Sequence, residues 1–104
     1  MNFEHGLLYY YKKQYRESIT CFLQALEEVT LEQRIESCFY LSLCYEQLGE
    51  TDNERNILLQ QFTYENPRPE ICCRLGSYYM REKSYDDAIY WFKLATRLSC
   101  KHLQ

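Results

Sequence analysis

The sequence predicts an all-α fold of three paired-helix units, on the strength of three observations. The chain has 104 residues, of which 46% are apolar and 26% are charged, a composition typical of one globular domain. It contains only three glycines and two prolines, too few for the many turns of a β-rich fold. A pattern of small and aromatic residues recurs three times, and short polar segments divide each copy into two helices.

The first unit, expected at residues 1–32, sets the pattern. Its small and aromatic residues follow one another at steps of 3, 6, 3, 4 and 3: Gly6, Tyr9, Tyr15, Ser18, Phe22 and Ala25. Steps of three and four place residues on one face of a helix. The polar turn at residues 12–14 separates the two helices, and the small residues let these helices approach each other closely.

The third unit, expected at residues 69–101, repeats these steps without change. Its members are Gly76, Tyr79, Tyr85, Ala88, Phe92 and Ala95. A polar turn at residues 82–84 again separates the helices. Pro69 is expected to open the first helix, because the first turn of a helix does not need the N–H that proline lacks.

The second unit, expected at residues 35–67, departs from the pattern. Its equivalent residues are Ser42, Tyr45, Thr51, Glu54, Leu58 and Gln61. Because Glu54 and Gln61 replace two small residues, we expect a looser or differently tilted helix pair. Gly49 is expected to end the first helix, and Thr51 or Asp52 to cap the second.

These spacings resemble the tetratricopeptide repeat, a helix–turn–helix unit of 34 residues. Residues 76–95 carry its signatures Gly-x-x-Tyr, Tyr-x-x-Ala and Phe-x-x-Ala, and the first copy has Ser18 in place of the first Ala. The resemblance implies a single domain over residues 1–104, in which three units stack as a short right-handed superhelix, an α-solenoid. It also implies that one set of residues packs the repeats: Gly6, Tyr9, Ser18, Phe22, Ala25, Ser42, Tyr45, Leu58, Gly76, Tyr79, Ala88, Phe92 and Ala95.

The same resemblance implies a surface for a protein or peptide partner, because such repeats bind chiefly on the concave face of their first helices. By that analogy the face is aromatic and mixed in character: Phe3, Leu7, Tyr10, Tyr11, Phe39, Leu43, Glu46, Gln47, Cys73, Ser77, Met80 and Arg81. Relatives that clamp a chaperone's C-terminal carboxylate use Lys, Asn and Arg at inner positions, where Leu7 and Phe39 stand here, so we expect no such clamp. Alternatively, several of the aromatic residues pack between repeats, although we expect Tyr10, Tyr11 and Tyr78 to be partly exposed.

A narrower resemblance concerns residues 68–76 and 85–92. They are similar to tetratricopeptide segments that follow the catalytic domain in bacterial family-two glycosyltransferases, which implies a parent enzyme that transfers a sugar from a nucleotide-sugar donor. We expect no catalysis and no cofactor in this chain, because it lacks an Asp-x-Asp motif and a Gly-rich loop. Asp86 and Asp87 are expected to complement a helix N-terminus. The alternatives are a free-standing adaptor, or a segment for homodimerisation or acceptor positioning in the parent enzyme.

Cysteine and charge set further expectations. The six cysteines fall in helix-like patterns, so we interpret them as small buried residues that are reduced in the cytoplasm, with disulfides or a metal site as alternatives. The net charge of −3 gives no general attraction for nucleic acid or an anionic membrane. No apolar run approaches the roughly 20 residues of a membrane span, and no secretory leader is evident.

The two ends of the chain differ in charge and lack evident caps. Residues 1–67 carry a charge of −6 and residues 68–104 a charge of +3, which favours head-to-tail contact or docking to a neighbouring domain, unless the charges merely solvate the surface. The last helix pattern includes Ile89, Trp91, Leu94 and Leu98, with no further helix to cover them all. We therefore expect either a fragment of a longer protein or a homo-oligomer formed through uncapped ends.

Overall fold

The computed structural model of the chain describes residues 2–28, 30–63 and 65–102. Within these ranges the secondary structure is all helix and no strand is present. In this described part of the chain six helices follow one another: α1 (Asn2–Tyr11), α2 (Tyr15–Glu28), α3 (Leu31–Gln47), α4 (Thr51–Gln61), α5 (Pro69–Arg81) and α6 (Tyr85–His102). The predicted all-α fold of three helix pairs is confirmed.

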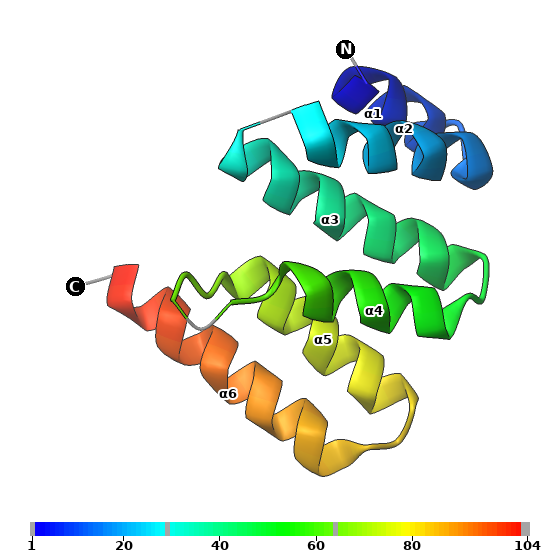
Figure 1. The fold of residues 1–104 in the computed structure, drawn as a ribbon. Helices are drawn as coiled ribbons and strands as arrows, with labels where there is room; N and C mark the ends of the chain where they lie inside the picture. Colours follow the sequence, from blue (N-terminus) through cyan, green and yellow to red (C-terminus); the bar gives the residue numbers. More distant parts are fainter. Residues whose placement is uncertain (1, 29, 64, 103–104) are drawn as a thin grey trace.

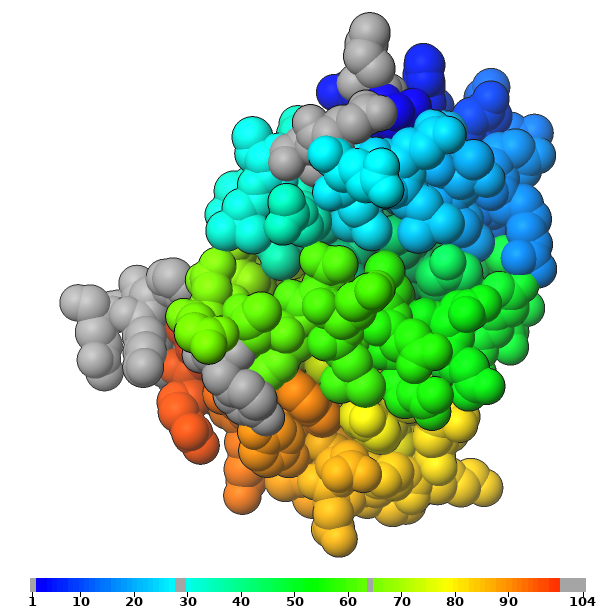
Figure 2. All heavy atoms as spheres, in the orientation of Figure 1, coloured from blue at the N-terminus to red at the C-terminus, as the bar shows by residue number. Residues whose placement is uncertain are grey.

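The helices stack in chain order to form a short α-solenoid, from α1 and α2 at one end to α6 at the other (Figure 1). In the space-filling view the colours also succeed one another down the molecule (Figure 2). Each helix contacts the next one along the chain, and α3 also contacts both α1 and α5. The first helices of the three units therefore form one continuous layer. None of the helices in the described residues is long and apolar enough to cross a membrane.

The turns inside the three units have one geometry. Lys13, Gly49 and Lys83 occupy equivalent positions and have φ angles of 63°, 73° and 64°. The N–H of each donates to a carbonyl three residues earlier, and the next N–H donates to a carbonyl five residues earlier, at 2.9–3.1 Å. This pair of bonds is the Schellman motif that ends a helix with a left-handed residue. The prediction that Gly49 ends a helix is confirmed.

The predicted cap of α4 is wrong. Thr51 is already the first helical residue, and Glu50 is the N-cap, without a side-chain capping bond. Because the left-handed turn residue is Gly49, only Glu50 lies between the turn and the helix, and it takes the N-cap position that we assigned to Thr51 or Asp52. The Glu50 carboxylate instead pairs with Arg16 of α2 and accepts a hydrogen bond from Asn53 at 2.9 Å.

The starts of α5 and α3 each have a residue that suits the first turn of a helix. Pro69 is the first residue of α5, as predicted. The hydroxyl of Thr30 caps α3 by accepting a bond from the N–H of Gln33 at 3.4 Å, so this helix begins at Leu31. That start lies four residues before the residue at which we expected the second unit to begin.

Close approach of paired helices centres on two glycines. A Cβ atom on Gly6 would lie 2.9 Å from the ring of Phe22, and one on Gly76 would lie 2.8 Å from the ring of Phe92. Ser18 of α2 also donates a hydrogen bond to the carbonyl of Gly6 at 2.8 Å. Buried side chains from all three units then form one core, including Phe22, Leu41, Leu58, Ile71 and Leu75.

Tyr78 is more buried than we expected, and Trp91, one of the four apolar residues of the last helix pattern, is also buried. Tyr78 is only 4% exposed, because its side chain lies on the α5 face that packs into the molecule. Trp91 of α6 is buried against Phe62, with ring centroids 4.9 Å apart. Leu94 and Leu98 are half-buried, whereas Ile89 is exposed.

The cysteines divide between core and surface. Cys38, Cys44 and Cys72 are buried free thiols, and burial raises the pKa of Cys38 to about 12 and that of Cys72 to about 11. Cys21 is half-buried, but Cys73 is exposed, so the expectation of burial is wrong for that residue. The side chain of Cys100 lies outside the described set. Among the described residues, no three His, Cys, Asp or Glu side chains gather as a metal site would require.

Candidate functional site

The candidate site is the face of α1, α3 and α5 that the sequence analysis assigned to a partner. Six of its residues are half-buried: Leu7, Tyr10, Phe39, Leu43, Glu46 and Ser77. Five others are exposed: Tyr11, Gln47, Cys73, Met80 and Arg81. Tyr11, with 68% of its surface exposed, is the most prominent aromatic residue of this face.

Phe3 does not belong to this surface. It is only 9% exposed and packs edge-on against Phe22 of α2, with ring centroids 5.8 Å apart. Its ring therefore stabilises the first helix pair and offers little area to a partner.

Four aromatic rings form a continuous row from α1 to α3, which we call the aromatic row: Tyr11, Tyr10, Tyr40 and Phe39. Successive ring centroids lie 5.3, 5.1 and 5.5 Å apart, and each contact is edge-to-face. Such pairs add to the stability that burial alone provides. Because these rings pack against one another, the row presents apolar surface area at fixed positions.

Tyr40 is the member of this row that the sequence analysis missed. Its ring stacks on Phe22 at 5.5 Å and also meets Tyr10, so it joins the first unit to the second. A hydrogen bond with Tyr11, together with burial, raises the pKa of Tyr40 to about 12. Tyr40 lies just outside the set of helix positions that the resemblance assigned to the partner face.

Beside the aromatic row lies a small hollow between α3 and α5, which we call the α3–α5 hollow. It has a volume of about 160 Å³ and is lined by Ile35, Glu36, Phe39, Tyr40 and Glu70. Apolar and aromatic groups thus share the lining with two carboxylates.

An ion pair flanks the hollow and joins the starts of α3 and α5. Arg68 donates two hydrogen bonds, each 2.9 Å long, to the two carboxylate oxygens of Glu32, and it lies 3.6 Å from Glu70. These bonds to Arg68 lower the pKa of Glu32. Glu36, one helical turn after Glu32, makes no ion pair within the described part of the chain.

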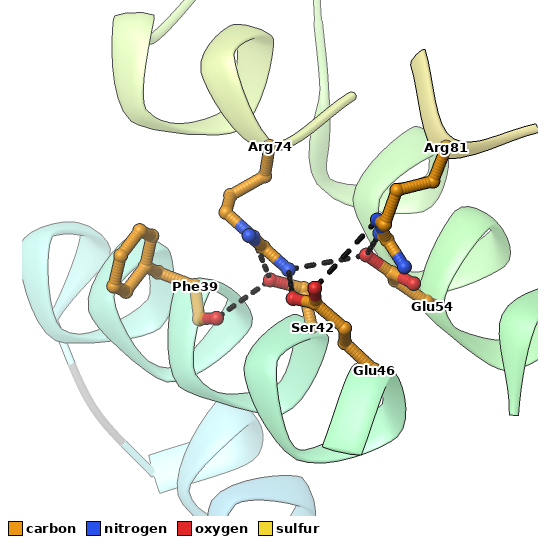
Figure 3. Close-up of polar contacts among 6 residues, drawn as sticks. All are labelled: Phe39, Ser42, Glu46, Glu54, Arg74 and Arg81. Atoms are coloured by element: carbon orange, nitrogen blue, oxygen red, sulfur yellow. Dashed lines mark hydrogen bonds and ion pairs between the residues drawn. The ribbon is translucent and has the colours of Figure 1, made fainter. Parts of the chain in front are cut away.

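A buried carboxylate joins the second unit to the third. The side chain of Glu54 in α4 is 0% exposed, and it pairs with Arg81 and with Arg74, the latter at 3.1 Å (Figure 3). Arg74 also binds Glu46 at 2.7 Å and donates to the hydroxyl of Ser42 at 3.0 Å. We call these five residues the Glu54 network.

The Glu54 network shows what the large residue of the second unit contacts. Glu54 stands where Ser18 and Ala88 stand in the other units, and its carboxylate is fully buried and meets two guanidinium groups that α5 supplies (Figure 3). These contacts join α4 to the third unit, so the expectation of a looser or differently tilted pair of α3 and α4 stays a prediction. Burial raises the pKa of Glu54, and Arg81 and then Arg74 oppose that rise.

The network also accounts for two charged residues of the candidate face. Arg81 lies 3.6 Å from Glu46 in addition to its pair with Glu54. Both arginines that α5 directs towards α3 and α4 are therefore held by carboxylates of this chain. A carboxylate of a partner would have to displace these internal pairs before it could bind either arginine.

Comparison with known families agrees with this architecture. The model of the family described as tetratricopeptide repeat matches residues 1–28 and 69–101, which together make up more than half of the chain. The two matches coincide with the first and third units, whereas the second has Glu54 and Gln61 in place of small residues. A comparison with curated proteins gave no match. Repeats of this kind generally mediate protein–protein interactions, and the chain belongs to the tetratricopeptide repeat family.

Proposed function

We propose that the chain is a non-catalytic interaction module that binds a protein or peptide partner along α1, α3 and α5. The observation that carries this proposal is the aromatic row, which crosses from α1 to α3 and reaches the α3–α5 hollow. Tyrosine suits such a surface because it offers both apolar area and a hydroxyl. Met80 of α5 is also exposed and adds an adaptable apolar contact.

Site-specific cross-linking tests which face meets the partner. A photoreactive phenylalanine analogue at Tyr11 should cross-link a partner in cells that make the protein, whereas the same analogue at Tyr85, an exposed tyrosine of α6, should not. Once the partner is identified, Tyr11→Ala and Phe39→Ala should each weaken its binding by about ten-fold, as expected for aromatic anchors.

The matched control is Leu59→Ala, which truncates an exposed apolar side chain of α4. This variant should bind as the unchanged chain does, and circular dichroism should show equal helicity in all variants. Cross-linking that is equally strong at Tyr85, or affinities that Tyr11→Ala and Phe39→Ala leave unchanged, would refute the proposed face.

We also propose a setting for the module, on the basis of the resemblance of residues 68–76 and 85–92. In this proposal it is part of a longer, cytoplasmic bacterial glycosyltransferase, where it docks a substrate protein, a partner or a neighbouring domain. The full-length open reading frame provides the test. A coding region for an α/β domain with an Asp-x-Asp motif ahead of residue 1 is the expected result, and a free-standing adaptor is the alternative.

Self-association through α6 is a second candidate function, favoured by one comparison within the chain. Ile89 of α6 is 50% exposed, whereas Ile19, at the equivalent position of α2, is 7% exposed. A shallow depression of about 470 Å³ surrounds Ile89 and is lined also by Phe92, Lys93, Thr96 and Arg97. Sedimentation should then show dimers that Ile89→Lys abolishes, and a strict monomer at high concentration would exclude this function.

A further inference from the structure

We propose that the α3–α5 hollow binds the side chain of a lysine or arginine from the partner. This inference rests on the proposed function, because it names the chemistry of the partner segment that lies on the same face. Three features of the hollow support it: its charge, its lining and its size.

The charge of the hollow favours a cation. Glu36 and Glu70 contribute carboxylates to its lining, and Glu32 lies one turn before Glu36 on α3. Arg68 is the cation beside them, and both of its terminal nitrogens already bind Glu32. Together the three glutamates and Arg68 carry three negative charges and one positive charge, so a cation of the partner would compensate the excess negative charge.

The lining suits the apolar part of a long basic side chain. Lysine and arginine bury their methylene groups along apolar surface and keep the charged end near solvent or a carboxylate. Ile35, Phe39 and Tyr40 supply that apolar surface. The two aromatic rings are also groups over which a cation is attracted.

The size of the hollow fits one side chain. Its volume of about 160 Å³ is well below the roughly 300–1,000 Å³ of pockets for small organic ligands. The aromatic row ends at Phe39 and Tyr40, which also line the hollow. A peptide that lies along the row can therefore place one side chain in the hollow.

The neighbouring charges disfavour an acidic partner residue at this place. A carboxylate in the hollow would face Glu36 and Glu70. Arg68, the arginine that flanks the hollow, is already paired with Glu32 and Glu70, and the two arginines of α5, Arg74 and Arg81, are bound to Glu46 and Glu54. We therefore assign the hollow to a basic residue.

Three matched peptides test this assignment by nuclear magnetic resonance. The probes are acetyl-Gly-Leu-X-Leu-Gly-amide with lysine, norleucine or glutamate at X, so that the charge changes while the leucines stay. We expect the lysine peptide to bind about five-fold more tightly than the norleucine peptide, the effect of one or two partly exposed charge pairs. Its largest amide shifts should fall at Ile35, Glu36 and Glu70, and the glutamate peptide should bind most weakly.

Variants of the chain show whether the two carboxylates cause the preference. Glu36→Gln combined with Glu70→Gln should abolish it, because the shape stays and the charge is removed. The control, Glu27→Gln combined with Glu82→Gln, removes the same charge from exposed positions of α2 and the α5–α6 turn and should leave the preference intact.

Three results would overturn the inference: equal binding of the lysine and norleucine peptides, a preference that persists in the Glu36 and Glu70 double variant, or no shift with the lysine peptide at about 1 mM. If all three peptides bind equally and shift residues of α1 and α3, the charge inference fails and the proposed function stands. Shifts confined to α4 and α6 would contradict both.

Discussion

At the scale of single residues, two glycines in equivalent positions differ in what surrounds them. A Cβ atom on either glycine would meet an aromatic ring within 3 Å. The ring beside Gly6 belongs to Phe22, which is fully buried, and the ring beside Gly76 belongs to Phe92, which is half-buried. A buried ring cannot move without repacking the core, whereas a ring near the surface can turn towards solvent.

Gly6→Ala should therefore destabilise the chain more than Gly76→Ala does. Overpacking a core costs about 1–3 kcal/mol, and alanine recovers about 1 kcal/mol of helix propensity at both positions. We expect a net loss of up to about 2 kcal/mol for Gly6→Ala and close to none for Gly76→Ala. Urea unfolding monitored by circular dichroism measures the free energy of unfolding of both variants. Equal losses would show that the burial of the two rings does not affect the cost of the added methyl group.

At the scale of the helices, the three turns inside the units share their hydrogen bonds but not their residues. Each turn has a left-handed residue at the same place, and only the middle turn has glycine there. A left-handed conformation costs a non-glycine residue roughly 1–2 kcal/mol. Lys13 and Lys83 therefore bear a strain that Gly49 avoids, and the hydrogen bonds of the turn hold them in place.

Lys13→Gly and Lys83→Gly should each raise the free energy of unfolding by about 0.5–1 kcal/mol, because relief of strain exceeds the entropy cost of glycine. Gly49→Ala should lower it by about 1 kcal/mol. Apart from Gly49 itself and its two chain neighbours, no described residue has an atom within 4 Å of a Cβ built on Gly49, so that loss would be purely conformational. Thermal unfolding of the three variants measures the effects, and a destabilising Lys13→Gly would contradict this account.

At the scale of the whole molecule, the Glu54 network fixes the third unit against the second. Glu54 lies on α4, its partners Arg74 and Arg81 lie on α5, and Arg74 also reaches Glu46 on α3. Removing one partner of a buried ion pair leaves a charge without compensation, which is costlier than never having the pair. The network therefore binds the stack together only as long as it is complete.

Glu54→Ala should destabilise the chain by about 2–4 kcal/mol, although a small residue is usual at this position in the family. The double variant Glu54→Ala with Arg74→Leu should cost less than Glu54→Ala alone, because it removes the uncompensated charge as well. Chemical denaturation of the single and double variants gives the free energy of interaction between Glu54 and Arg74.

Glu32→Gln serves as the control for this comparison, because it breaks an exposed ion pair and should have a much smaller effect. If Glu54→Ala unfolds at the same denaturant concentration as the unchanged chain, the network adds nothing to stability.

The sequence by itself determined the class of fold and some of the places where helices begin and end. The spacing of small and aromatic residues showed three helix pairs, Gly49 marked a turn, and Pro69 marked a helix start. These features depend on residues within one or two turns of each other, so backbone geometry and helical periodicity suffice to predict them.

Only the tertiary structure decided which faces of different units meet. Glu54 finds partners 20 and 27 residues away, Tyr40 completes a row that begins on α1, and Phe3 turns into the core. No local pattern encodes these pairings, because they depend on how each helix is rotated about its axis and how successive units are placed against each other. The sequence therefore predicts the units, and the packing between them determines the surface to which we assign a partner.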